Sequence, residues 1–126
     1  MVEIYLKNEI WQNGDLEVVE ATYRGRIFDK GGNTFVEYLE SKEERVVLKI
    51  NHDNFEMLRF GNQRSKLVLS KNQEATAYFY YPELTLTFKT KVISRRTADN
   101  SIKIKYQLLD IPDASVIGSY RLTIVW

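Results

Sequence analysis

Apolar and polar residues alternate along most of the chain. In residues 84–92, every second residue from Leu84 to Val92 is apolar or threonine, and the residues between them are threonine or lysine. Residues 102–108 and 120–126 repeat this arrangement. A repeat at every second residue is typical of strands with one face in a core and the other in water, whereas a helix repeats about every 3.6 residues. The pattern predicts a chain built of β-strands, and no segment has a competing helical period.

Seven further runs with strand character precede these three, and turn-forming residues such as Asn13-Gly14 and Gly61-Asn62 separate them. The runs are residues 2–7, 16–28, 34–40, 45–50, 55–60, 65–69 and 75–80. About ten strands joined by short links predict an antiparallel meander. Closure removes the exposed edges of such a meander. We therefore expect an all-β, up-and-down barrel of about 8–10 strands, with a two-sheet sandwich as the alternative. Residues 94–100, which include Arg95-Arg96, and residues 110–116 are expected to form polar rim loops.

Composition narrows the classes of function. The 126 residues suit one domain over 1–126, and 18 basic against 17 acidic residues give a net charge of +1. So balanced a charge predicts no nucleic-acid or membrane-surface partner. The chain has no cysteine and one histidine, His52, which excludes disulfides, thiol chemistry and a multi-histidine zinc site. We expect no cofactor. Without an N-terminal apolar segment typical of a signal peptide, a cytoplasmic location is expected.

The side chain of Arg59 is the main candidate for chemistry, and hairpin register decides where it points. With residues 61–62 as a two-residue turn, Arg59 faces water; with a loop of 61–63, it faces the interior. The preceding hairpin favours the interior, because an even-length loop such as 51–54 places Ile50 and Arg59 on the same face.

A buried arginine needs a partner, since an isolated buried charge is very unfavourable. The segment 35–40 offers a carboxylate on either face, Glu37 on one and Glu40 on the other. It lies two strands from Arg59, about 10 Å between backbones, which two long side chains can span. We predict an ion pair of Arg59 with Glu40 or Glu37, made directly or through Tyr78 or Tyr80.

The chain also resembles a known family, the YwiB-like proteins, a group of small uncharacterised bacterial proteins with a lipocalin-like (calycin) barrel. The resemblance rests on Tyr38-x-Glu40, Arg59-x-Gly61, and Tyr81-Pro82 followed by the alternating strand that starts near Leu86. It covers most of the chain from about residue 16. The sequence departs from the family pattern at Glu83-Leu84, where a glycine is expected. The resemblance implies a calycin barrel in the bacterial cytoplasm and favours Glu40 as the inward carboxylate; it implies no reaction.

Two functions fit these residues. The first is a carrier or sensor that binds a small apolar or anionic ligand around Arg59, with hydroxyl groups from Tyr38, Tyr78 or Tyr106. The alternative is a structural or protein-interaction module with a filled barrel, in which the Arg59–Glu40 pair only fixes the register. Such a module is expected to use its outer surface.

In the second function, the outward side chains of Leu58, Phe60 and Val68 would hold a partner or a second copy, so a monomer or a homodimer is expected. An enzyme is the third and least favoured class, because no catalytic or phosphate-binding motif is present.

Overall fold

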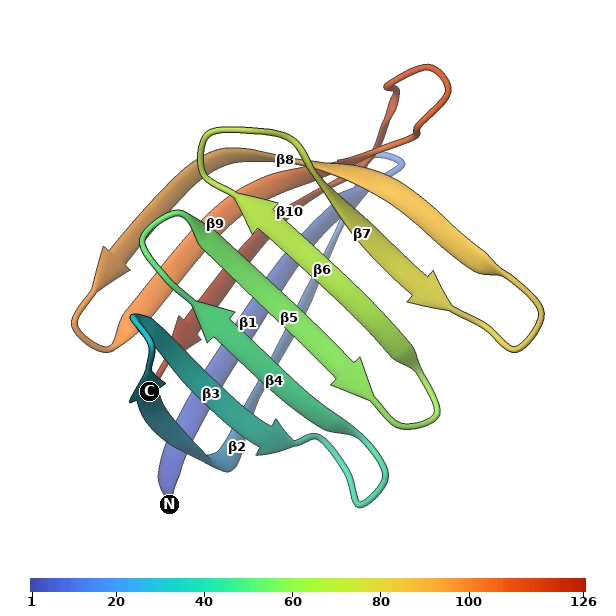
Figure 1. The fold of residues 1–126 in the computed structure, drawn as a ribbon. Helices are drawn as coiled ribbons and strands as arrows, with labels where there is room; N and C mark the ends of the chain where they lie inside the picture. Colours follow the sequence, from blue (N-terminus) through green and yellow to red (C-terminus); the bar gives the residue numbers. More distant parts are fainter.

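The computed structural model describes residues 1–126 and contains ten strands and no helix (Figure 1). The strands are β1 (Val2–Gln12), β2 (Asp15–Lys30), β3 (Asn33–Leu39), β4 (Arg45–Ile50), β5 (Asn54–Phe60), β6 (Arg64–Ser70), β7 (Ala75–Tyr80), β8 (Thr85–Ala98), β9 (Ser101–Leu109) and β10 (Val116–Val125). The structure has no helix that is long and apolar enough to span a bilayer.

The ten strands form one closed barrel. Each strand pairs antiparallel with the next along the chain, and β10 closes the sheet by pairing with β1. The predicted all-β, up-and-down antiparallel barrel is confirmed, and the two-sheet sandwich is wrong. Both chain termini lie at one end, which we call the near end, together with the turns at 31–32, 51–53, 71–74 and 99–100. The turns at 13–14, 40–44, 61–63, 81–84 and 110–115 lie at the opposite, far end.

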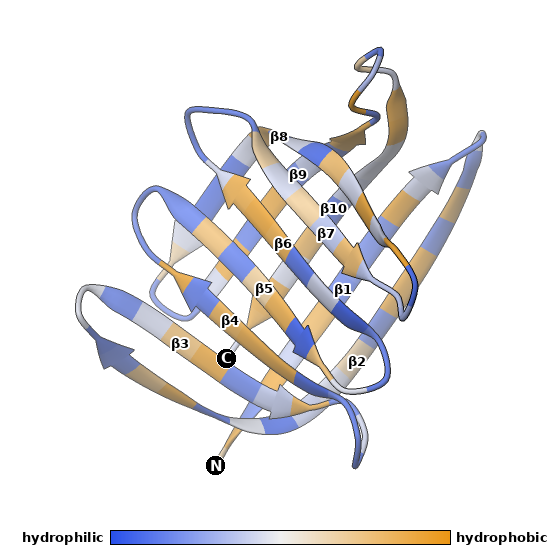
Figure 2. Ribbon diagram, turned by 45° about the vertical axis from the view of Figure 1, so that its right-hand side comes forward, coloured by the Kyte–Doolittle hydropathy of each residue, from blue (hydrophilic) through white to orange (hydrophobic).

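Alternating side chains fill the barrel. Eighteen buried residues form a single core cluster, whose large members include Phe55, Leu48 and Leu69. The colouring of Figure 2 shows the alternation directly, with apolar and polar residues following one another along each strand. Inward Val46, Leu48 and Ile50 agree with the sequence pattern. The apolar period of two thus specifies both the strand type and the buried face.

Two expectations about β8 are wrong. Leu84 and Leu86 are exposed instead of buried, because the β7–β8 hairpin extends beyond the barrel wall (Figure 1). The strand also continues to Ala98, through residues expected to form a loop. Its register shifts at Ile93, between Val92 and Ser94. Such a β-bulge inverts the facing of the residues after it, which sends the side chain of Arg95 inward.

Candidate functional site

Arg59 points into the barrel near its far end. Ile50 pairs with Phe55 across a four-residue loop, and the same register places Arg59 opposite the buried Val46. On its other side Arg59 pairs with Ser65. The predicted inward orientation is therefore confirmed, and it follows from the even length of the preceding loop.

The partner of Arg59 is Glu40. Arg59 Nη1 donates a hydrogen bond to Glu40 Oε1, and the two side chains keep 29% and 25% of their surface exposed. Glu37 lies on the outer face, where Arg26 Nε donates to its Oε2 at 2.9 Å and Arg45 approaches its other oxygen. The predicted ion pair is thus present with Glu40 and not with Glu37.

Tyrosine side chains surround this pair inside the barrel. Tyr38 stacks on Tyr23 with 4.9 Å between ring centroids, and Tyr106 stacks on Tyr120 at 5.0 Å. Burial raises the pKa of Tyr38 and of Tyr106 far above the ordinary tyrosine value, while the positive charge of Arg59 opposes the rise. The hydroxyl of Tyr38 is buried and has no hydrogen-bond partner. Tyr38 and Tyr106 therefore lie where the sequence predicted, near Arg59.

Tyr78 does not belong to this cluster, so its predicted place in the interior is wrong. It pairs with Lys66 and Thr87 on the outer face and stacks on Tyr80, with ring centroids 6.2 Å apart. Neither tyrosine can bridge Arg59 to its carboxylate. The reason is register: Ala77, which is fully buried, and Phe79 take the inward positions of β7.

The surroundings of Arg59 favour a structural role. The guanidinium is neutralised by Glu40, and none of the principal pockets of the structure is lined by Arg59, Glu40 or Tyr106. A pair that joins the end of β5 to the chain just after β3 fixes the relative register of two strands that are not neighbours.

Replacing either partner tests this role. We expect Arg59→Met and Glu40→Gln each to lower the free energy of unfolding by roughly 1–3 kcal/mol, because each leaves a half-buried charge or acceptor without its partner. In the double variant, the two losses should overlap by about 1 kcal/mol, a value reduced by the partial exposure of the pair. Urea unfolding of the four proteins measures the coupling; losses that simply add would show that the pair contributes nothing.

A second polar site lies at the near end of the barrel. It is a pocket of about 360 Å³, whose walls come from the turns of that end, the end of β8 and the C-terminus. Its lining is mostly polar and includes Asn51, His52, Lys71, Arg95, Thr97, Asp99 and Trp126. The pocket is separate from the Arg59–Glu40 pair, which lies at the far end.

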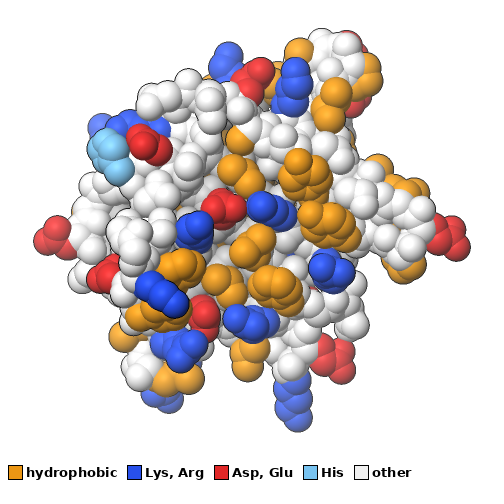
Figure 3. Space-filling view, in the orientation of Figure 1, with side chains coloured by type: hydrophobic (Ala, Val, Ile, Leu, Met, Phe, Trp, Pro, Cys, Tyr) orange, Lys and Arg blue, Asp and Glu red, His pale blue; other side chains and the backbone are white.

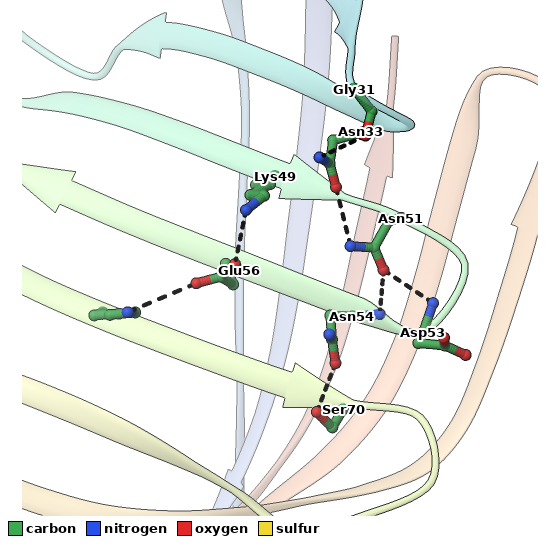
Figure 4. A network of polar contacts seen from close by, with 9 residues as sticks. Gly31, Asn33, Lys49, Asn51, Asp53, Asn54, Glu56 and Ser70 are labelled. Carbon is green, nitrogen blue, oxygen red and sulfur yellow. Dashed lines mark hydrogen bonds and ion pairs between the residues drawn. The ribbon is translucent and has the colours of Figure 1, made fainter.

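The side chain of Asn51 organises the rim of this pocket (Figure 4). Its Oδ1 accepts hydrogen bonds from the backbone N–H groups of Asp53, at 3.0 Å, and Asn54, at 2.8 Å. Its Nδ2 donates to Asn33 Oδ1 at 3.0 Å, which connects the β4–β5 turn to the β2–β3 turn. Asn54 in turn accepts from Ser70 at 2.6 Å. These bonds hold three neighbouring turns in one arrangement without any ligand.

Arg95 carries the positive charge of the pocket. Its Nη2 donates to the backbone carbonyl of Asn51, its Nη1 is buried without a hydrogen-bond partner, and no carboxylate is within ion-pair distance. Burial lowers the pKa of Arg95, and Asp53 partly counteracts this effect. Arginine still keeps its charge at neutral pH. Unlike Arg59, Arg95 is a half-buried cation that forms no ion pair.

Sequence reasoning missed this residue. Arg95 and Arg96 were expected in a polar rim loop, but both lie in β8. Only Arg96 is exposed, and it pairs with Lys103 on the outer face, whereas Arg95 pairs with the buried Ile104. The inversion depends on the bulge at Ile93, for which the alternating pattern gives no signal. No group of three or more histidine, aspartate or glutamate side chains is placed to hold a metal ion.

Fold and sites together define a small, closed antiparallel β-barrel with polar groups at both ends of a packed interior. Residues 4–124 match the family model described as a domain of unknown function, DUF1934, and the chain belongs to this family. The fold is also similar to the crystal structure of the ywiB protein from Bacillus subtilis. The TM-score is 0.77 at 17% sequence identity, over 98% of this chain and 89% of that one. These findings confirm the resemblance to YwiB-like proteins. The comparison with curated proteins gives no match.

Proposed function

We propose that this protein is a non-enzymatic, calycin-type binding barrel that takes a small anionic ligand in the pocket at its near end. The observation that carries the proposal is the charge of Arg95, which faces the pocket without a carboxylate partner. The sequence pointed to a ligand around Arg59, but Glu40 already occupies that guanidinium. The pocket at Arg95 is the better candidate.

The walls of the pocket suggest the chemistry of the ligand. A volume of about 360 Å³ lies at the lower end of the range that small-molecule sites occupy. Arg95 and Lys71 supply positive charge, and the hydroxyls of Thr34 and Thr97 supply hydrogen-bonding groups. Asp99 also lines the pocket and limits the net charge that it accepts. A ligand with one carboxylate or phosphate group therefore fits better than a polyanion.

An apolar part of the ligand has its own contacts. Ile50, Ile102 and Trp126 line the same pocket. An aromatic or short aliphatic portion could pack against them while its acidic group meets Arg95. This combination agrees with the apolar and anionic character that the sequence suggested.

Paired arginine variants test the proposal. We expect benzoate or inorganic phosphate, added at constant ionic strength, to raise the melting temperature of the unaltered protein. Ligand at about 100 times its Kd adds roughly 2.7 kcal/mol of stability. The increase should disappear in Arg95→Gln and persist in Arg96→Gln, which removes the same charge from the outward face of the same strand. No increase in the unaltered protein, or an equal one in Arg95→Gln, would contradict the assignment.

One observation supports the second candidate, an interaction module. The outer face of β3–β7 presents apolar side chains between lysines and arginines (Figure 3), among them the outward Leu58, Phe60 and Val68. The core behind this face is packed, so the face needs no ligand to keep its shape. Failure of anions to bind would favour this candidate.

A further inference from the structure

The first half of β2 is an unpartnered sheet edge. The part of β2 from Asp15 to Gly25 pairs with β1, from Gln12 back to Val2. In contrast, β3 pairs only with the part of β2 that begins at Gly25. Residues 15–24 therefore have a neighbouring strand on one side only, and none of the backbone hydrogen bonds made outside the strands involves them. In Figure 2 this part of β2 forms the free right-hand border of the protruding β1–β2 hairpin.

This edge is apolar as well as unpaired. Leu16, Val18 and Val19, in the first part of β2, keep 53%, 47% and 46% of their surface exposed. An exposed edge of this length is a ready template for another strand, because every second residue presents a free N–H and C=O. The hairpin holds it in an extended conformation, so little ordering is needed on binding.

We propose that the partner is a second copy of this chain, which adds its own β2 antiparallel to this edge. In an antiparallel pair of strands, directly opposed residues face the same side of the sheet. A two-fold axis normal to the sheet therefore lies midway between one residue and the same residue of the other copy. With the axis at Val19, residues 15–23 of each copy pair over nine positions. Leu16 then meets Thr22, and Glu17 meets Ala21, so that no acidic residue faces another.

Neighbouring registers fit less well. An axis at Glu20 sets that carboxylate against its own copy, which is unfavourable for directly opposed residues. An axis at Val18 shortens the pairing to residues 15–21. The register at Val19 also matches the length of the edge, because the partner's β2 begins opposite Tyr23, just before β3 takes over at Gly25. The length of the edge favours self-pairing, and in this register the three acidic residues of residues 15–23 are not directly opposed to one another.

Single cysteines test this register directly, since the chain has no cysteine of its own. In an antiparallel pair, directly opposed Cα atoms are about 4.5–5.5 Å apart, which is within disulfide range. Val19→Cys should therefore form a disulfide-linked dimer on mild oxidation. Glu17→Cys and Ala21→Cys should each stay unlinked alone but cross-link when mixed, because these residues face each other.

Val125→Cys serves as the matched control, since Val125 is a similarly exposed strand residue, at 40%, outside this edge. We expect Val19→Cys to link at least roughly tenfold faster than this control, as for groups held at high effective concentration. Sedimentation of the unaltered protein should show a reversible dimer that Val19→Lys abolishes. Equal rates for Val19→Cys and Val125→Cys, self-linking of Glu17→Cys or Ala21→Cys, or a strictly monomeric unaltered protein would each overturn the proposal.

Discussion

Replacement of Gly25 by alanine is expected to prevent the barrel from closing between β2 and β3. A Cβ atom at this position would lie 2.1 Å from the carbonyl oxygen of Glu37, 2.6 Å from Ile4 Cδ1 and 3.0 Å from Tyr38 Cβ. The carbonyl is backbone, and Gly25 pairs directly with Tyr38, so the overlap can be relieved only by separating the two strands. We expect a loss of about 4 kcal/mol or more, at the upper limit of single substitutions.

Gly118→Ala is the control for this prediction. The three atoms nearest to a Cβ atom there belong to side chains, the hydroxyl of Tyr120 at 2.8 Å and Cγ and Nε2 of Gln12 at 3.1 Å, so the contact can be relieved without separating two strands. Urea unfolding followed by circular dichroism should therefore show a folded Gly118→Ala protein and an unfolded or barely stable Gly25→Ala protein. Similar midpoints for the two variants would mean that the contact at Gly25 relaxes easily.

High pH is expected to unfold the protein cooperatively, because Tyr38 and Tyr106 are kept neutral in the folded barrel. Burial raises the pKa of both hydroxyls, so above about pH 10 the unfolded chain releases protons that the folded protein retains. The unfolded state then binds fewer protons, and the free energy of unfolding falls as pH rises. Each tyrosine removes about 1.4 kcal/mol per pH unit in this range, or roughly 4–5 kcal/mol for both between pH 10 and 12.

The ultraviolet absorbance of tyrosinate, measured beside urea unfolding at each pH, checks this prediction. Tyr106→Phe should reduce the pH dependence above pH 10, by less than half because the pKa values of Tyr5, Tyr23 and Tyr120 are also raised. Tyr81→Phe, at an exposed position, should leave it unchanged. A free energy of unfolding that stays constant through this range, or full tyrosine ionisation in the folded protein, would show that the two hydroxyls are not shielded as the structure indicates.

Much of the fold follows from the sequence because one physical signal governs it. A period of two, interrupted by turn residues, specifies ten strands, and short links leave the meander as the simplest topology. The same reasoning extends to Arg59, since an even loop between Ile50 and Phe55 fixes its orientation, and the segment 35–40, two strands away, contains only two acidic candidates.

For Tyr78 and Arg95, prediction failed because of a single-residue shift that alternation does not reveal. Tyr78 lies in a run of aromatic residues that fits either facing of the strand equally well. The facing becomes clear only from the packing, in which the neighbouring Ala77 is buried. Arg95 follows a bulge that reverses its facing. The pocket at the near end is formed by turns that are far apart in the chain, and no short sequence motif indicates that these turns lie side by side.

We propose that a small anion binds at the Arg95 end of the barrel and not at Arg59. Backbone amide NMR during a titration with benzoate tests this proposal most directly, because residues at the two ends of the barrel give separate amide signals. We expect the amide signals of Asn51, Thr97 and Asp99 to shift in a saturable way, and Arg95→Gln to abolish these shifts. Shifts centred on Arg59 and Glu40, or no saturable shifts at any position, would contradict it.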